Sequence, residues 1–131
     1  MTKMKPFKMV GDRWSIEEIY SDEPPASGHI ALVIDQEHYP LIDYPTSRAI
    51  GMAIALTSGG GGSVLSVRVG ERKMRFVPQN YAVTIISPSY VEHVFDTPEA
   101  RGFARYLWSS ELQPFPYPEG TLFPSPHYEE K

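Results

Sequence analysis

The apolar residues of this chain fall in short runs that prolines and glycines separate. Residues 29–34, His-Ile-Ala-Leu-Val-Ile, form a nearly continuous run between Gly28 and Asp35, which predicts a buried strand. Such runs are too short and too often interrupted for a helical bundle, and they indicate strands joined by turns. Further strand-like runs cover residues 39–44, 49–56 and 81–87.

The clearest local pattern predicts a hairpin. Residues 64–69 and 72–77 flank the dipeptide Gly70-Glu71, and glycine at the first turn position is typical of a type II′ loop. Counting back from the turn predicts a buried face and a polar face, and a slip of one residue would mix them. The buried pairs are Val67 with Met74 and Leu65 with Phe76, and the polar pairs are Arg68 with Lys73 and Ser66 with Arg75.

Two stretches fit a helix as well as a strand. Residues 14–20 contain Ser15 and Glu18 at the spacing of a capping box, but they also fit a first strand. Residues 97–112 follow Asp96, an N-cap residue, with an early proline and a glutamate. The alternative there is a turn at 97–102 and a strand at 103–108.

These patterns predict one mainly β domain. A chain of 131 residues, 41% hydrophobic, is long enough for a single core, and 13 prolines and 10 glycines suit short strands. We expect cupin-like or jelly-roll antiparallel sheets, with a short N-terminal helix as one option. The alternative is an α+β fold, a curved sheet plus one helix at 97–112. Residues 113–131 carry five prolines and several aromatic residues, and we expect this extended segment to pack on the domain.

Composition predicts the compartment of the protein and one class of partner that it does not bind. No run of about 18 apolar residues is present, and the absence of cysteine suits an intracellular protein. A net charge of -4 argues against direct nucleic-acid binding. Residues 59–63, Gly-Gly-Gly-Gly-Ser, match the repeat of designed flexible linkers, so this loop is either native and flexible or engineered.

Charge is unevenly distributed along the chain. Residues 12–43 carry eight acids and one base, Arg13, whereas residues 68–75 carry four bases and one acid. Like charges opposed across a hairpin repel, so an acidic or phosphorylated partner would relieve them. The other interpretation is that these bases protect a sheet edge from aggregation. The four bases are Arg68, Arg72, Lys73 and Arg75.

No assembled catalytic motif is present. The four histidines are scattered, and adjacent strand residues such as Glu92 and His93 point to opposite faces, which is a poor start for a metal site. We therefore expect no cofactor and no catalysis, and a metal-dependent cupin enzyme is the last of our alternatives.

The middle of the chain, about residues 48–108, resembles the N-terminal effector-binding domain of AraC-type transcription regulators. The resemblance implies a cupin-like domain that binds a small effector and helps to form a homodimer. It makes Arg48 a pocket residue and His93 a candidate contact. Arg105 stands where arabinose-responsive members hold the sugar, so a sugar ligand is not implied. The similar stretches are Arg48-Ala49-Ile50-Gly51-Met52, Gly70-Glu71-Arg72, Arg75-Phe76-Val77-Pro78, Ile86-Ser87-Pro88, Glu92-His93 and Pro98-Glu99-Ala100-Arg101.

Together these observations favour a non-enzymatic binding or interaction module. The first interpretation is the effector-binding or dimerisation domain of a regulator. The alternative, if residues 97–112 are helical, is a module similar to polo-box or pleckstrin domains that binds proteins or phosphopeptides. The candidate contacts are Arg48, Arg68, Arg72, Lys73, Arg75, His93 and Arg105.

Overall fold

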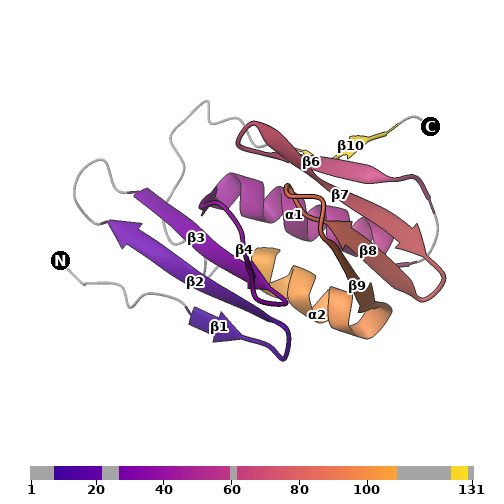
Figure 1. Cartoon of the computed structure of the whole chain (residues 1–131), viewed down its shortest axis with the longest axis horizontal. Helices are drawn as coiled ribbons and strands as arrows, with labels where there is room; N and C mark the ends of the chain where they lie inside the picture. The colour runs from indigo at the N-terminus through magenta and orange to yellow at the C-terminus, as the bar shows by residue number, and fades with distance from the viewer. Residues whose placement is uncertain (1–7, 22–26, 60–61, 109–124, 130–131) are drawn as a thin grey trace.

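The computed structural model describes residues 8–21, 27–59, 62–108 and 125–129 (Figure 1). It contains two antiparallel five-stranded sheets and two helices, with 47% strand and 27% helix. The mainly β class is therefore confirmed. None of the described helices has the length and apolar character that a membrane span requires.

The first sheet is built from the N-terminal third of the chain. Its strands are β1 (Lys8–Val10), β2 (Trp14–Ser21), β3 (Ser27–Ile34), β4 (Glu37–His38) and β5 (Ile42–Asp43). They lie in the order β1-β2-β3-β4, and β5 also pairs with β3. The helix option for residues 14–20 is wrong, because β2 pairs with β3 along its whole length. Its buried residues alternate along the strand, and Glu18 is among them as the acceptor of a hydrogen bond from the Tyr44 hydroxyl.

The second sheet contains the predicted hairpin. Its strands are β6 (Leu65–Val69), β7 (Arg72–Gln79), β8 (Ala82–Ile86), β9 (Glu92–Asp96) and β10 (His127–Tyr128), in the order β10-β6-β7-β8-β9. The register is the predicted one: Val67 lies opposite Met74 and Arg68 opposite Lys73. Gly70 has φ +63°, as the first position of a II′ turn requires. The predicted inner residues Leu65, Val67, Met74 and Phe76 are all buried.

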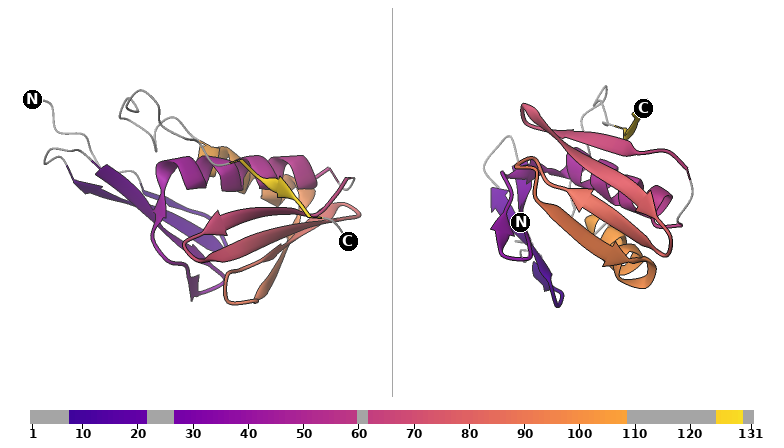
Figure 2. Two further views of the ribbon diagram at one scale, coloured as in Figure 1. Left: turned by 90° about the horizontal axis from the view of Figure 1, so that it is seen from above. Right: turned by 45° about the vertical axis from the view of Figure 1, so that its right-hand side comes forward.

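Helix α1 (Tyr44–Thr57) corrects the prediction for residues 49–56, which are helical and not a strand. The Asp43 side chain accepts a hydrogen bond from the Thr46 amide at 2.8 Å and caps the helix, and Pro45 lies in its first turn. The extended segment predicted over residues 39–44 shortens to β5, because the helix begins at Tyr44. Figure 2 shows α1 lying across both sheets. It is apolar on nearly every side because it is buried between the sheets and the second helix.

Helix α2 (Thr97–Trp108) settles the second open choice as a helix. Asp96 caps it by accepting from the Glu99 amide at 2.9 Å, and one face is buried. The strand option for 103–108 is therefore wrong, and residues 109–112 lie outside the described part.

The two helices pack closely against each other. A Cβ on Gly51 would lie 3.0 Å from the Ala104 carbonyl oxygen, so glycine permits this approach. The Ser47 hydroxyl donates to the Leu107 carbonyl at 2.9 Å, and the Thr97 hydroxyl to the Ser58 carbonyl at 2.7 Å. The approach of Ala104 explains the glycine in the middle of residues 49–56.

The connections within each sheet are local. Neighbouring strands are neighbours in the sequence, apart from β10 and the pairing of β5 with β3. A jelly-roll instead carries Greek-key connections, which bring together strands that are distant in the chain. The alternative of a sheet followed by one helix at 97–112 correctly describes the order of β6–β9 and α2. Of the predicted C-terminal segment, residues 127–128 form β10 on the edge of β6, and residues 113–124 lie outside the described part.

Candidate functional site

The seven predicted contact residues lie in three places. His93 is buried where the two sheets meet, and Arg48 and Arg105 lie on the helix pair. The four remaining residues, Arg68, Arg72, Lys73 and Arg75, lie on the β6–β7 hairpin.

The basic face of the hairpin already has an acidic contact within the chain. The Arg75 Nε donates to Glu129 Oε2 at 2.7 Å, beside β10. Arg68 donates to the Gly70 carbonyl at 3.3 Å, within its own hairpin. Arg72 turns to the β8–β9 loop and donates to the Pro88 carbonyl at 3.3 Å. Within the described residues, Lys73 alone of the four has no hydrogen-bond or ion-pair partner.

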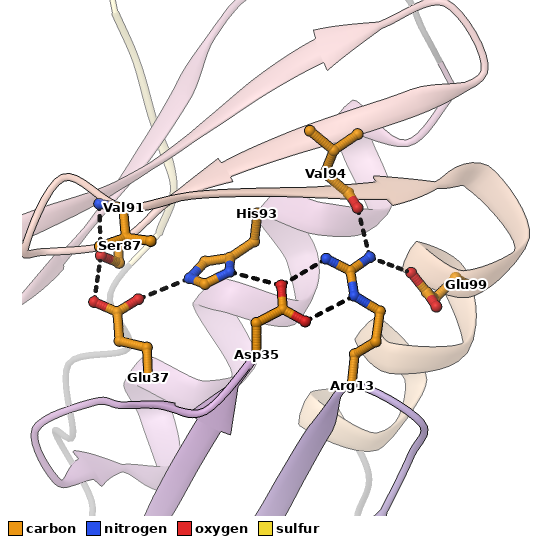
Figure 3. A network of polar contacts seen from close by, with 8 residues as sticks. All are labelled: Arg13, Asp35, Glu37, Ser87, Val91, His93, Val94 and Glu99. Carbon is orange, nitrogen blue, oxygen red and sulfur yellow. Dashed lines mark hydrogen bonds and ion pairs between the residues drawn. The ribbon is translucent and has the colours of Figure 1, made fainter.

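His93 is the centre of a polar network between the sheets (Figure 3). Its side chain is 2% exposed, and each ring nitrogen faces a carboxylate. Nδ1 lies 2.9 Å from Asp35 Oδ2, and Nε2 lies 2.7 Å from Glu37 Oε1. Both ring nitrogens of His93 are therefore occupied by carboxylate partners from the β3–β4 turn.

Arg13 extends the network to α2 and β9. It donates to both Asp35 carboxylate oxygens, at 2.8 and 2.6 Å, and to Glu99 Oε1 at 2.9 Å. It also donates to the Val94 carbonyl at 2.6 Å, on the edge of β9, and its guanidinium lies 4.5 Å from the centroid of the Phe95 ring. The hydrogen bonds from Arg13 and then from His93 lower the pKa of Asp35 from 3.8 to about 2, against the opposing effect of burial.

Glu37 connects the network to the loop between β8 and β9. The Ser87 hydroxyl donates to Glu37 Oε2 at 2.8 Å and accepts from the Ser89 and Val91 amides at 3.2 and 3.1 Å. This loop and the β3–β4 turn hold three of the four described non-glycine residues with positive φ. These residues are Asp35 (48°), Gln36 (70°) and Tyr90 (67°). The network therefore holds two strained backbone segments in place.

The network connects the two sheets and is suited to holding them together. Both nitrogens of His93 are engaged by carboxylates, and the Ser87 hydroxyl is held between Glu37 and the amides of its own loop. Among the described residues no group of three or more histidine, aspartate or glutamate side chains is placed to hold a metal ion.

Burial, followed by the nearby carboxylates of Glu37 and Asp35, raises the pKa of the Tyr39 hydroxyl, and the Ser87 side chain opposes this shift.

Sequence reasoning selected His93 but missed its partners. Arg13 is the single base in an acidic stretch of 32 residues, 12–43, and that isolation was a usable sign of an internal ion pair. Asp35 and Glu37 follow a buried strand directly, where a tight turn presents their side chains. Only folding brings these groups to β9, more than 55 residues later.

A groove between α1 and α2 is the second candidate site. It has a volume of about 350 Å³, and its floor is made of small residues from both helices: Gly51, Ala55 and Ala104. Trp108, 40% exposed, closes one end, and the guanidinium of Arg48 lies 4.9 Å from the centroid of its ring. Arg105 thus lines the groove, and Arg48 contacts it through the Trp108 ring at its end.

Two exposed arginines on α2, Arg101 and Arg105, line this groove. Arg101 and Arg105 lie one helical turn apart, and both are exposed. Neither has a hydrogen-bond or ion-pair partner within the described residues. Arg101 was not among the predicted contacts, and its i, i+4 spacing from Arg105 becomes informative only once α2 is known to be a helix.

The similarity of residues 48–108 to AraC-type effector domains stays a prediction. The candidate residues it indicated lie in separate places, with Arg105 in the groove, Arg48 stacked on Trp108 and His93 between the sheets. Comparisons with protein-family models, with curated proteins and with solved structures found no match to this chain.

Proposed function

We propose that this domain is a non-enzymatic binding module whose α1–α2 groove takes an acidic segment of a protein partner. The observation that carries the proposal is a pair of exposed arginines, Arg101 and Arg105, beside an apolar floor, with no ion-pair partner among the residues that the structure describes. The helical character of residues 97–108 also supports the interaction-module interpretation, since the groove depends on α2 being a helix.

The chemistry of the groove suits an anion joined to an apolar side chain. An arginine guanidinium offers planar donor pairs that match carboxylate or phosphate oxygens. The small residues Gly51, Ala55 and Ala104 leave room for one apolar side chain, and the exposed Trp108 ring adds a flat contact surface. A volume of about 350 Å³ is at the lower end of the range of ligand sites, which is enough for a single anchoring side chain.

Charge distribution supports an acidic partner over a neutral one. The chain as a whole carries a net charge of -4, so a basic groove stands out from its surroundings. Arg48, Arg101 and Arg105 are all on the helix pair, and a local positive field attracts and orients acidic segments. A phosphorylated side chain has the same chemistry at higher charge.

The test uses synthetic peptides and the amide spectrum of the whole chain. One peptide carries glutamates on both sides of a leucine, the second has glutamine for each glutamate, and the third has phosphoserine. We expect the acidic and phosphorylated peptides to shift amides of α1 and α2, and the glutamine peptide to have little effect. The double variant Arg101→Gln/Arg105→Gln should weaken binding of the acidic peptide by about tenfold or more.

A matched control separates the groove from general attraction to positive charge. Arg68→Gln/Lys73→Gln removes the same charge from the hairpin, and it should leave peptide affinity within about twofold at physiological salt. Equal loss in both variants, or amide shifts that follow the hairpin instead of the helices, would contradict the proposed site. Binding of a small aromatic carboxylate in place of the peptides would instead support an effector-binding domain.

A further inference from the structure

The outer face of the second sheet has an ordered distribution of charge. Alternate residues of β6–β9 point away from the helices, and their neighbours, such as Phe76 and Phe95, point into the core. In Figure 1 this face is turned toward the viewer, with α1 behind it. The outward residues are Ser66, Arg68, Lys73, Arg75, Val77, Gln79, Ala82, Thr84, Ile86, Glu92, Val94 and Asp96.

Crossing this face from β6 to β9 leads from base through apolar residues to acid. One row of the register runs from Ser66, which is buried, through Arg75 and Ile86 to Glu92. The next row is Val77, Thr84 and Val94, with Val94 56% exposed. The basic edge also carries the directly opposed pair of Arg68 and Lys73.

Because one side of this face is basic and the other acidic, two copies of the face can pack with opposite charges in contact. We propose that the outer face of β6–β9 is the contact surface for a second copy of this chain, packed face to face about a two-fold axis parallel to the strands. A two-fold axis in this direction places the basic β6–β7 side of one copy over β9 of the other. The apolar residues at the centre of the two faces then contact each other. Glu92 of one copy then lies over β6–β7 of the other at the level of Arg75, and Lys73 lies two residue pairs further along the hairpin.

Several features of the described chain favour this occupant. Neither Lys73 nor Glu92 has an ion-pair partner among the described residues, so both charges are free for an intermolecular contact. An acidic residue from the copy relieves the repulsion between Arg68 and Lys73. The Arg13 guanidinium donates to the Val94 carbonyl on the open edge of β9, so a strand of another chain cannot pair with that carbonyl. This opposes association through the β9 edge and favours association through the outer face.

The area of this face determines how tightly we expect two copies of the chain to bind each other. The four strands β6–β9, about 4.8 Å apart and about 17 Å long, present roughly 330 Å² in the plane of the sheet. This is below the roughly 800 Å² per partner of standard interfaces, so the dimer is weak, with a Kd of micromolar order or higher. The face lies on the opposite side of the sheets from the helix pair, so a dimer carries two free α1–α2 grooves, and its existence does not depend on the proposed function.

The test is sedimentation velocity over a protein range of about 10 to 500 µM, spanning the weak end of the affinity scale. The native chain should shift from monomer to dimer, and Lys73→Glu or Glu92→Lys should each raise the dimer Kd by about tenfold or more. An equimolar mixture of these two variants should recover the dimer, because both charge contacts are restored in the mixed pair. The double variant K73E/E92K should recover it as well.

Matched controls keep the result independent of folding and of the groove. Lys73→Glu places a carboxylate opposite Arg68 and Glu92 is exposed, so the thermal midpoints of both single variants should stay close to the native value. Arg101→Gln/Arg105→Gln should leave the dimer unchanged. A native chain that stays monomeric at the highest concentration overturns the proposal, as does a dimer that both single variants form normally or that their mixture fails to restore.

Discussion

Arg13 and Arg48 each hold a guanidinium over an aromatic ring, at 4.5 Å from the centroid of Phe95 and 4.9 Å from that of Trp108. Arg13 is paired with the carboxylates of Asp35 and Glu99, and its hydrogen bonds connect both sheets and α2. Beside Arg48, the helix pair carries two further arginines, Arg101 and Arg105, that have no partner among the described residues.

The difference separates charges that stabilise the fold from charges available for binding. A buried or half-buried ion in the network costs free energy to desolvate, so each one is present together with its partners. An exposed arginine on a helix is fully hydrated and costs the fold little, so it can remain unpaired. The network is thus a structural feature, and the groove is the place of the function we propose, although each lies beside an arginine stacked on an aromatic ring.

The largest expected effect is on the network. His93→Ala leaves the carboxylates of Asp35 and Glu37 without the donor between them, and we expect it to lower the free energy of unfolding by about 2–4 kcal/mol. Urea unfolding at neutral pH measures this loss. His38→Ala removes an exposed histidine from the adjacent strand and should change stability by less than about 0.5 kcal/mol. Similar small losses from both substitutions would mean that the network does not hold the sheets together.

A smaller effect is expected in the acid dependence of stability. The pKa of Asp35 falls from 3.8 to about 2 in the folded state, so its ionised form stabilises the fold above pH 3.8. This contribution should decrease as the pH falls from 3.8 through about 2. Asp35→Asn retains a residue that tolerates the positive φ of this turn and removes the ionisation. The native chain should therefore lose stability relative to Asp35→Asn in this pH window, as measured by urea unfolding at several pH values. A constant difference between the two proteins from pH 5 to pH 2, which brackets that range, would contradict the assignment.

The smallest expected effect is on the groove. Arg101→Gln/Arg105→Gln removes two exposed charges that have no described partner, and stability should change by less than about 0.5 kcal/mol. Thermal unfolding checks this value on the same protein used for the peptide measurements. A loss above about 1 kcal/mol would assign these arginines a structural role, and any loss of peptide binding would then need another explanation.

The two helices show how far the sequence alone could be interpreted. Both begin with the same spacing, Asp43-Tyr44-Pro45-Thr46 and Asp96-Thr97-Pro98-Glu99, and in both the aspartate caps the helix. For α2, apolar residues at helical spacing on an otherwise polar segment made a helix one of the two options. In α1 the apolar residues are on nearly all sides, so no helical period was visible and the run looked like a strand. The Asp-x-Pro pattern at the start of α1 was the sequence feature that predicts a helix there, and the prediction did not use it.

Local sequence determined the β6–β7 hairpin completely, including its turn, register and buried face, because a two-residue glycine turn and the side-chain alternation of period two depend only on neighbouring residues. It also determined the mainly β composition and the cap of α2. Tertiary structure decided that residues 49–56 are helical, that Glu18 and His93 are buried, and that Arg13 joins Asp35, Val94 and Glu99. These outcomes depend on contacts between groups 22 to 86 residues apart. No local pattern encodes such pairs, since burial and pairing of a charge are properties of the packed chain and not of its neighbours in sequence.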